Sequence, residues 1–584
     1  TDPSQLATAL KAAVVEARRA VEFGFTATEY ARYKANLLSS LDKAYSNKDK
    51  RKNTQFFNEC LGYFLTNEPM PSIDYTYQLM KQIVPAIPVE AVNEYMSQLI
   101  PKNDSNIVIV NFNNEKEGNV YPTREELLTA LMQAKQAQVT AYVDNVKNEP
   151  LITKKPTPGK IKSEKKNALM GYTELKLSNG ATVVIKHTDL KKDQVLLSGE
   201  GFGGSSLYGA KDYVNANLFD EVIGVSGLGQ FSSTELQKAL AGKIANVDLG
   251  MSYKKMSVGG SSTPKDVETM LQMLYLYFTN INKDEKSFAN LIEQYKVSLK
   301  NRSLSPEKAL QDSLTATLYG HNPRLKPVEV ADLQHVSYDR ILEMAKERTA
   351  NAAAWTFTII GNFDEATLRP LICQYIASLP SQKNIVKGKR VTFLQKGKID
   401  NTFKRKMETP KATSFKIWFN EDMPYTLEND IRASIAGQVL SMVYLKKIRE
   451  DAGAAYTCGA QATASIEDDY HLIQMLGYCP MKPEKKELAL SIMEGAVRDM
   501  TQTVDADMVA KIKAVMLKQA DDVAKSNGYW NGVIGVYRKY GIDTHTDYKK
   551  LVSAQTPQTI SDFMKEFLKS NNYITVTMLP DESK

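Results

Sequence analysis

The sequence predicts an α+β protein built from repeated domains, each with an antiparallel-rich sheet packed against helices. The 584 residues exceed the roughly 250–300 at which one hydrophobic core stops growing, so about three domains are expected. One order of elements recurs three times along the chain: a long amphipathic helix, further helices, then a helix leading into an apolar, β-rich strand. Alternating apolar and polar residues also flank Asn179-Gly180, the strongest short-range signal for a β-hairpin.

The first copy of the repeat begins with two helices. A helix is expected over residues 6–23, and Gly24 can end it because glycine tolerates the left-handed conformation of a helix C-terminus. Thr26 and Glu29 have the spacing of a capping box, in which both side chains satisfy free N–H groups at a helix start. The next helix is therefore predicted over residues 30–42.

This copy closes with a helix near residues 89–99 and a strand over 107–112. No strand-rich segment precedes its helices, unlike in the other two copies. Residues 1–150 are therefore predicted to be the back portion of a domain whose beginning lies upstream. Thr1 falls directly before a helical pattern, which favours the same interpretation.

Residues 151–168 are rich in proline and lysine and lack periodicity, so they are predicted to be a linker. The second domain is expected over residues 169–385. It contains the hairpin, a helix over 338–348 and a strand over 355–360.

The third domain is expected over residues 386–584. Its strands are predicted at 415–419, 470–478 and 573–579, and a helix follows Pro557. Three matching orders of elements favour duplication. The alternative is coincidence, since a helix–helix–strand order is common in α+β proteins.

Composition narrows the classes of function. Apolar residues make up 43% and charged residues 24% of the chain, which is typical of a folded protein rather than a disordered one. The net charge of +7 is a small difference between 74 basic and 67 acidic residues. The lysine-rich stretches at 43–52 and 154–166 contain one aromatic residue between them, Tyr45, rather than a series for base stacking, so no nucleic-acid partner is expected. No run of about 18 apolar residues occurs, so no transmembrane segment is expected.

The residues that most often hold metals or carry catalysis form no recognisable motif. The four cysteines are too sparse for a disulfide framework and are expected to be buried thiols. Cys458 and Cys479 lie on two predicted strands that could pair, which leaves a single disulfide as the alternative. None of the five histidines has another three to five residues away. No catalytic or metal-ligating residue is therefore assigned in this chain.

One segment, residues 444–457, carries a resemblance to a known family. Its sequence is Tyr-Leu-Lys-Lys-Ile-Arg-Glu-Asp-Ala-Gly-Ala-Ala-Tyr-Thr, which places Arg449 and Tyr456 seven residues apart. It resembles the substrate-contacting Arg…Tyr element in the C-terminal half of pitrilysin/insulinase-type zinc peptidases, the inverzincins. Weaker resemblances are the hairpin at 177–183 and the glycine-rich stretch at 199–206.

The resemblance implies a fold of four related pitrilysin-like domains, paired as two halves that close around a peptide. Residues 1–150 would then be the back of the second domain, 169–385 the third, inactive-type domain and 386–584 the fourth. In this family each first-half domain carries its H-x-x-E-H zinc motif on a helix after such a hairpin. The helix expected here at 213–225 has no histidine, and Asp220 and Glu221 point in different directions, so the helix is expected to be structural.

The implied function is that of the C-terminal half of a zinc metalloendopeptidase, a hydrolase that is inactive without its N-terminal half. Zinc is expected in the intact enzyme, with none bound by this chain. The implied partners are a peptide substrate and either the chain's own N-terminal catalytic half or a separate catalytic subunit. Arg449 and Tyr456 would contact the substrate and its oxyanion. A bacterial periplasmic location rests on the resemblance alone.

Two alternatives remain open at this stage. The chain could be a non-catalytic peptide-binding or scaffold subunit of the same fold. At the level of residues, Arg449 could cap its own helix by bonding the last carbonyls, while Tyr456 packs on a half-buried strand.

Overall fold

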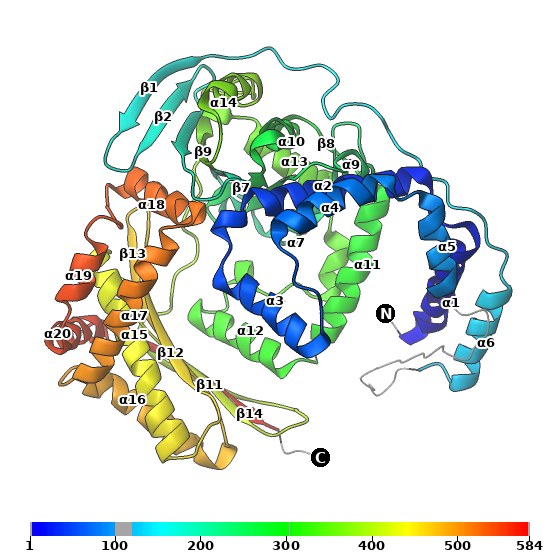
Figure 1. Ribbon diagram of the computed structural model, residues 1–584. Coiled ribbons are helices and arrows are strands. Elements are labelled where there is room, and N and C mark those ends of the chain that lie inside the picture. The colour runs from blue at the N-terminus through cyan, green and yellow to red at the C-terminus, as the bar shows by residue number, and fades with distance from the viewer. Residues whose placement is uncertain (1–2, 100–119, 303, 582–584) are drawn as a thin grey trace. The chain divides into compact units, whose positions relative to one another are not determined.

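The computed structural model describes residues 3–99, 120–302 and 304–581 (Figure 1). The strand predicted over 107–112 lies outside the described residues. The chain divides into two compact units, which are described in turn. Unit 1 comprises Thr1–Phe202, Leu218–Val297 and Ser337–Val386, and unit 2 comprises Gly203–Asn217, Ser298–Val336 and Lys387–Lys584.

Unit 1 begins with a helical region. Its helices are α1 (Leu6–Phe23), α2 (Ala27–Ser46), α3 (Asn53–Thr66), α4 (Ile73–Ala86), α5 (Val89–Leu99) and α6 (Arg124–Gln136). The predicted capping box is confirmed: the Glu29 N–H donates to Thr26 Oγ1 at 3.2 Å, and the Thr26 N–H donates to Glu29 Oε2 at 2.8 Å. Gly24 follows α1 with a φ of 71°, as expected for a residue that ends a helix.

A seven-stranded sheet forms the centre of unit 1. Its spatial order is β1 (Ile161–Asn167), β2 (Tyr172–Leu177), β3 (Thr182–His187), β9 (Trp355–Gly361), β4 (Val195–Phe202), β7 (Lys255–Ser262) and β6 (Ala245–Met251). All neighbours are antiparallel except β3 and β9. The hairpin predicted at Asn179-Gly180 is confirmed as the β2–β3 connection.

The predicted linker at 151–168 needs a correction, because it contains strand β1. This strand is at the edge of the sheet, and five of its seven residues are exposed. Charged side chains are typical of edge strands because they discourage pairing with another chain. The same charges remove the alternation of apolar and polar residues that would have predicted a strand.

The remaining helices of unit 1 flank its sheet. They are α8 (Phe219–Gly224), α9 (Ser233–Ala239), α10 (Val267–Thr279), α11 (Glu285–Arg302, which continues into unit 2), α13 (Tyr338–Thr349) and α14 (Glu365–Leu371). Phe278 of α10 packs edge-on against Trp355 of β9, with ring centroids 4.8 Å apart. Apolar strand residues and this helix therefore share one core.

The single helix predicted over 213–225 is two short helices, α7 (Tyr213–Asn217) and α8. Asn217 ends α7 and donates its side-chain amide to the Tyr213 carbonyl at 2.8 Å. Asparagine competes in this way with backbone hydrogen bonding, which makes it unfavourable inside a helix.

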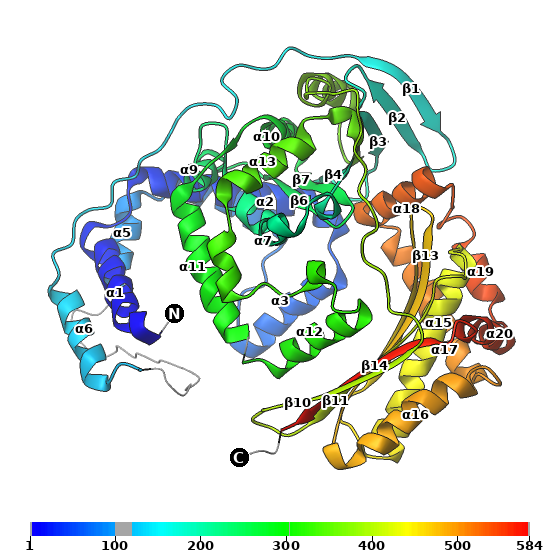
Figure 2. The same ribbon diagram turned by 180° about the vertical axis from the view of Figure 1, so that it is seen from behind.

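Unit 2 contains a five-stranded sheet with helices on one face (Figures 1 and 2). The strand order is β10 (Lys398–Arg405), β14 (Asn572–Pro580), β11 (Ala412–Asn420), β13 (Tyr470–Met481) and β12 (Gly459–Glu467). Its main helices are α15 (Leu427–Tyr444), α16 (Lys486–Asp499), α17 (Ala506–Val523), α18 (Asn527–Tyr540), α19 (Tyr548–Ala554) and α20 (Pro557–Leu568).

The opposite face of this sheet is partly covered by α12 (Pro306–Leu318). Leu310, Leu314 and Leu318 of α12 pack with Ile417 and Val576 of the sheet in one buried cluster. Asn401 of β10 also donates its amide to the hydroxyl groups of two α12 residues, at 2.8 and 3.1 Å. The sheet therefore has two apolar faces, one fully covered by helices and one covered in part.

The two sheets share one strand order, which supports the predicted duplication. In unit 1 the order β3–β9–β4–β7–β6 contains one parallel pair followed by antiparallel pairs. In unit 2 the order β10–β14–β11–β13–β12 has the same directions. In each set of five strands, the strand that comes last in the chain lies between the two that come first: β9 lies between β3 and β4, and β14 lies between β10 and β11. This pattern is far more specific than a recurring order of helices and strands.

Close packing between α15 and β12 leads to a first prediction, that Gly437→Ala destabilises unit 2. A Cβ atom at Gly437 would lie 2.3 Å from the Ala462 nitrogen and 2.7 Å from the Gln461 carbonyl carbon. Because both are backbone atoms, the helix must move away from the strand. We expect a loss of about 1–3 kcal/mol, measured by amide hydrogen exchange in α15 and β12.

Gly495→Ala in α16 is the matched control. A Cβ atom there would meet nothing within 4 Å. We therefore expect Gly495→Ala to stabilise unit 2 by about 0.5–1 kcal/mol, the usual advantage of alanine over glycine inside a helix. Equal effects of the two substitutions would contradict the proposed packing constraint.

Candidate functional site

Arg449 lies in a π-helical segment, η10 (Leu445–Asp451), that continues α15. The Ala452 N–H donates to the Lys447 carbonyl at 3.1 Å, and the Ala454 N–H donates to the Ile448 carbonyl at 2.9 Å. Gly453 between them has a φ of 54°, a conformation that glycine adopts without strain. The segment therefore ends in a tight glycine turn.

Tyr456 follows this turn and precedes β12. Its side chain is 86% exposed, so it does not pack on a half-buried strand, and that alternative is wrong. The Arg449 Cζ atom lies 5.4 Å from the centroid of the Tyr456 ring, within the range of a cation–π interaction. The glycine turn therefore brings together two residues that are seven apart in the sequence.

The hydrogen-bonding groups at the ends of both side chains have no protein partner among the described residues. Within the described residues, neither the Arg449 guanidinium nor the Tyr456 hydroxyl makes a hydrogen bond or ion pair. Arg449 therefore does not cap its own helix with its side chain, so the capping role considered for it in the sequence analysis is also wrong. Five N–H donors and one phenol O–H are available to a molecule that arrives from solvent.

A groove of about 620 Å³ opens on the sheet face that α12 leaves uncovered. Phe415, Leu476 and Tyr478 supply much of its floor, and Gly459, three residues after Tyr456, is at its side. The rings of Phe415 and Tyr478 are 4.9 Å apart. The polar lining includes Gln311 and the ion pair between Lys411 and Glu307, 3.0 Å apart. An apolar floor with a few polar groups is typical of a site for side chains of a ligand.

The sequence does not predict this groove. The alternation of apolar residues in β11 and β13 was visible, but not which of their faces stays open. That depends on the register, which pairs Phe415 with Tyr478, and on how far α12 covers the sheet.

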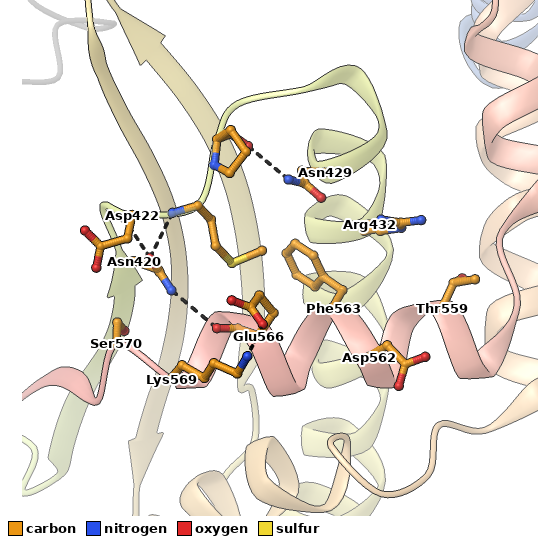
Figure 3. Close-up of a pocket in the computed structure, with 12 residues that line it drawn as sticks. Asn420, Asp422, Asn429, Arg432, Thr559, Asp562, Phe563, Glu566, Lys569 and Ser570 are labelled. Atoms are coloured by element: carbon orange, nitrogen blue, oxygen red, sulfur yellow. Dashed lines mark hydrogen bonds and ion pairs between the residues drawn. The ribbon is translucent and has the colours of Figure 1, made fainter.

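A second hollow in unit 2, of about 490 Å³, is shown in Figure 3. The Asn420 amide donates to the Phe567 carbonyl at 3.0 Å, and its oxygen accepts from the N–H groups of Asp422 and Met423. Lys569 pairs with Glu566 and Arg432 with Glu428. The Asn420 bond holds the end of α20 against β11, and the two ion pairs each join residues of one helical segment, so the hollow is explained by its structural bonds.

No metal centre is apparent in the described part of the chain. There, no three His, Cys, Asp or Glu side chains are grouped so that they could hold an ion. Asp220, on the helix considered above, accepts a hydrogen bond from the Met251 N–H at 2.7 Å. Burial of the Asp220 side chain raises its pKa. This carboxylate therefore anchors α8 to β6. Nor is any helix of the described residues long and apolar enough to cross a membrane.

The cysteines are free thiols of differing exposure. Cys458 and Cys479 are buried as expected, but Cys60 is exposed and Cys373 partly exposed. The expectation of buried thiols is therefore wrong for Cys60, which lies on α3, a helix without a buried residue.

Comparison with known proteins identifies part of this architecture. Residues 335–516, which include Arg449 and Tyr456, match the family model described as "Peptidase M16 inactive domain". This segment is therefore similar to a peptidase M16 inactive domain. The resemblance to pitrilysin/insulinase-type zinc peptidases, inferred from the sequence, is confirmed.

Two relatives match this chain over nearly all of its length. "Zinc protease PQQL-like" from Arabidopsis thaliana is 23% identical over 100% of the chain, and "Probable zinc protease PqqL" from Escherichia coli is 22% identical over 96%. The chain spans 61% and 60% of the length of these relatives.

Solved structures show the same fold. The periplasmic protease PqqL from Escherichia coli has a TM-score of 0.67 at 21% identity, covering 98% of this chain and 63% of that one. The ferredoxin protease FusC, solved with Arabidopsis ferredoxin, has a TM-score of 0.69 at 16% identity, covering 100% and 64%. The predicted α+β, pitrilysin-like fold class is confirmed.

Proposed function

We propose that this chain is the C-terminal part of a zinc metalloendopeptidase and that Arg449 and Tyr456 contact its peptide substrate. The observation that carries the proposal is the pair itself: two exposed side chains, held together by a glycine turn, whose hydrogen-bonding groups have no partner in the described structure. The names of the relatives and the share of their length that the chain spans agree with it.

The pair suits the chemistry of amide hydrolysis. Attack on a peptide carbonyl builds negative charge on its oxygen, and a phenol O–H aimed at that oxygen lowers the barrier. A guanidinium can bind a neighbouring carbonyl or a terminal carboxylate with two N–H groups in fixed geometry. In this proposal Tyr456 stabilises the oxyanion and Arg449 fixes the register of the peptide.

Zinc would belong to the remaining part of the enzyme. The described residues of this chain offer no ligand set that fits the ion, so no step of this proposal uses zinc. The proposal also assigns the domains of the chain. Residues 169–385 would be the inactive-type third domain, 386–584 the fourth, and 1–150 the back of the second.

The test is hydrolysis of a quenched peptide mixture by this chain alone, by the upstream part of the same gene product, and by the two together. The proposal expects activity in the mixture only, and loss of that activity with a chelator. Activity of this chain alone would contradict it. Confirmed association of the two parts without hydrolysis would instead favour a non-catalytic scaffold.

The groove beside the pair provides a second prediction. If peptide side chains enter it, Phe415→Ala should weaken binding of a peptide with a large apolar residue about tenfold, because a buried aromatic contributes about 1.5 kcal/mol or more. Fluorescence anisotropy of labelled peptides would measure this.

Lys404→Ala, at an exposed position on β10 of the same sheet, is the matched control and should change little. A peptide with aspartate in place of the apolar residue should lose its sensitivity to Phe415→Ala. Equal weakening of both peptides would mean that Phe415 supports the fold rather than the ligand.

We place the enzyme in the bacterial periplasm, where the similar protease PqqL is found. Fractionation of cells that express the full gene product would test this location.

A further inference from the structure

Cys458 and Cys479 lie directly opposite each other at the end of two paired strands. Strands β12 and β13 are antiparallel, with Gly459 opposite Tyr478. Continuing this register by one residue places Cys458 opposite Cys479. Opposed residues in an antiparallel pair have Cα atoms roughly 4.5–5.5 Å apart, which lies within the range of about 4.4–6.8 Å that a disulfide spans.

Both thiols are buried beneath the helical layer of unit 2, where Cys458 is 6% and Cys479 0% exposed. The neighbouring Cys479 thiol, together with the positive charge of Arg449, lowers the pKa of Cys458. The neighbouring Cys458 thiol and burial raise the pKa of Cys479. Cys458 is therefore the better nucleophile of the two, because the thiolate is the reactive form.

The loop that carries Tyr456 is attached directly to Cys458. Within the described structure, the backbone groups of Ala455, Tyr456 and Thr457 take part in no hydrogen bond, whereas Ala454 is held at both its N–H and its carbonyl. Cys479, in contrast, is inside β13, which pairs with β11 and β12. Any backbone movement that accompanies formation of a disulfide should therefore occur at Cys458 and in the loop before it.

We propose that Cys458 and Cys479 are a redox pair, and that their oxidation to a disulfide repositions Tyr456 relative to Arg449. A disulfide restrains the side-chain torsions and the Cα separation of its two residues. Any adjustment of the backbone that this restraint causes at Cys458 acts two residues from Tyr456. The effect on peptide contacts rests on the function proposed for Arg449 and Tyr456, whereas the disulfide and the loop movement do not.

Oxidation requires an oxidised dithiol or a small disulfide as co-reactant. The Cys458 thiolate attacks one sulfur of that disulfide, which releases one thiolate and leaves a mixed disulfide. Cys479 then loses its proton to solvent and attacks the Cys458 sulfur, which forms the S–S bond and releases the second thiolate. The protein loses two electrons and two protons, and the co-reactant becomes a pair of thiols.

The test compares this chain in reduced and oxidised dithiothreitol. After denaturation and alkylation, mass spectrometry should show four reactive thiols in the reduced chain and the loss of two in the oxidised chain, with chymotryptic peptides joining positions 458 and 479. Amide hydrogen exchange over residues 452–458 should differ between the two forms.

Two variants keep the test decisive. Cys458→Ser and Cys479→Ala should each abolish both changes, whereas Cys60→Ser, at an exposed site, should leave both unchanged. Four reactive thiols in oxidised dithiothreitol would overturn the redox pair, and a disulfide without altered exchange would overturn the coupling to Tyr456. None of these measurements uses peptidase activity, so failure of the proposed function would leave their outcome unchanged.

Discussion

Tyr456→Phe in the intact peptidase is expected to lower kcat at least about tenfold, and up to about 100-fold, with little change in KM. The substitution removes one hydroxyl from a ring that is 86% exposed, so the fold loses no packing. A donor that meets the oxyanion acts mainly in the transition state, and its loss therefore appears in kcat. Steady-state hydrolysis of a quenched peptide provides both constants.

Tyr75→Phe is the matched control. Tyr75 lies on α4 and is 59% exposed, so the same chemical change should leave both constants as they were. An unchanged kcat for Tyr456→Phe would rule out its contact with the oxyanion.

Arg449 should behave differently in the same assay. Arg449→Ala should raise KM, because the guanidinium binds carbonyl or carboxylate groups that are present before the reaction. Arg449→Lys should restore only part of the affinity, since an ammonium group keeps the charge but loses the planar fork. An effect of Arg449→Ala on kcat alone would assign Arg449 to the transition state instead.

Local sequence signals predicted the elements whose ends are set by their own residues. The helices expected at about 6–23 and near 89–99 correspond to α1 and α5, and the capping box at Thr26 forms as expected. The Asn179-Gly180 hairpin and the strand β14 were predicted because turn chemistry and β-branched residues act over a few positions. These features require no knowledge of the tertiary structure.

Elements that depend on distant partners could not be found in this way. Strand β1 is charged and exposed, and it exists because β2 provides its hydrogen-bonding partners. The break between α7 and α8 has only a weak local signal in Asn217. The groove at Phe415 depends on strand register and on the position of α12, which comes from a segment about a hundred residues away in the chain.

The candidate site shows both cases. The spacing of Arg449 and Tyr456 was visible in the sequence. The absence of other partners for the two side chains was not, because it depends on every neighbouring element. That observation, rather than the spacing, is the main support for the substrate contact proposed for the pair.

Asp144→Ala is expected to destabilise unit 1 by about 3 kcal/mol, the cost typical of breaking a buried ion pair. The Asp144 side chain is 3% exposed and binds Arg32 of α2 through both oxygens, at 2.7 and 3.0 Å. Lys238 of α9 contacts the same carboxylate at 2.8 Å. The substitution leaves two largely buried cations without their counter-charge, and urea unfolding at pH 7 would measure the loss.

The same carboxylate makes unit 1 sensitive to acid. The hydrogen bonds from Arg32 hold the pKa of Asp144 well below its ordinary value. The contribution of the ionised Asp144 to the free energy of unfolding is therefore complete above the pKa of about 3.9 expected in the unfolded chain. It declines as the pH falls below that value, towards the lower folded pKa. Between pH 5 and pH 3, Asp144→Asn should therefore lose less stability than the unmodified chain.

Asp49→Asn is the control for both measurements, because Asp49 is 70% exposed and its ion pair with Lys192 is long, at 3.9 Å. It should change stability by less than about 0.5 kcal/mol and leave the acid response intact. If Asp144→Asn lost as much stability in acid as the unmodified chain, another carboxylate would have to account for the acid sensitivity. The ion pair would then hold the extended segment around Asp144 to α2 and α9 without setting the pH dependence of unit 1.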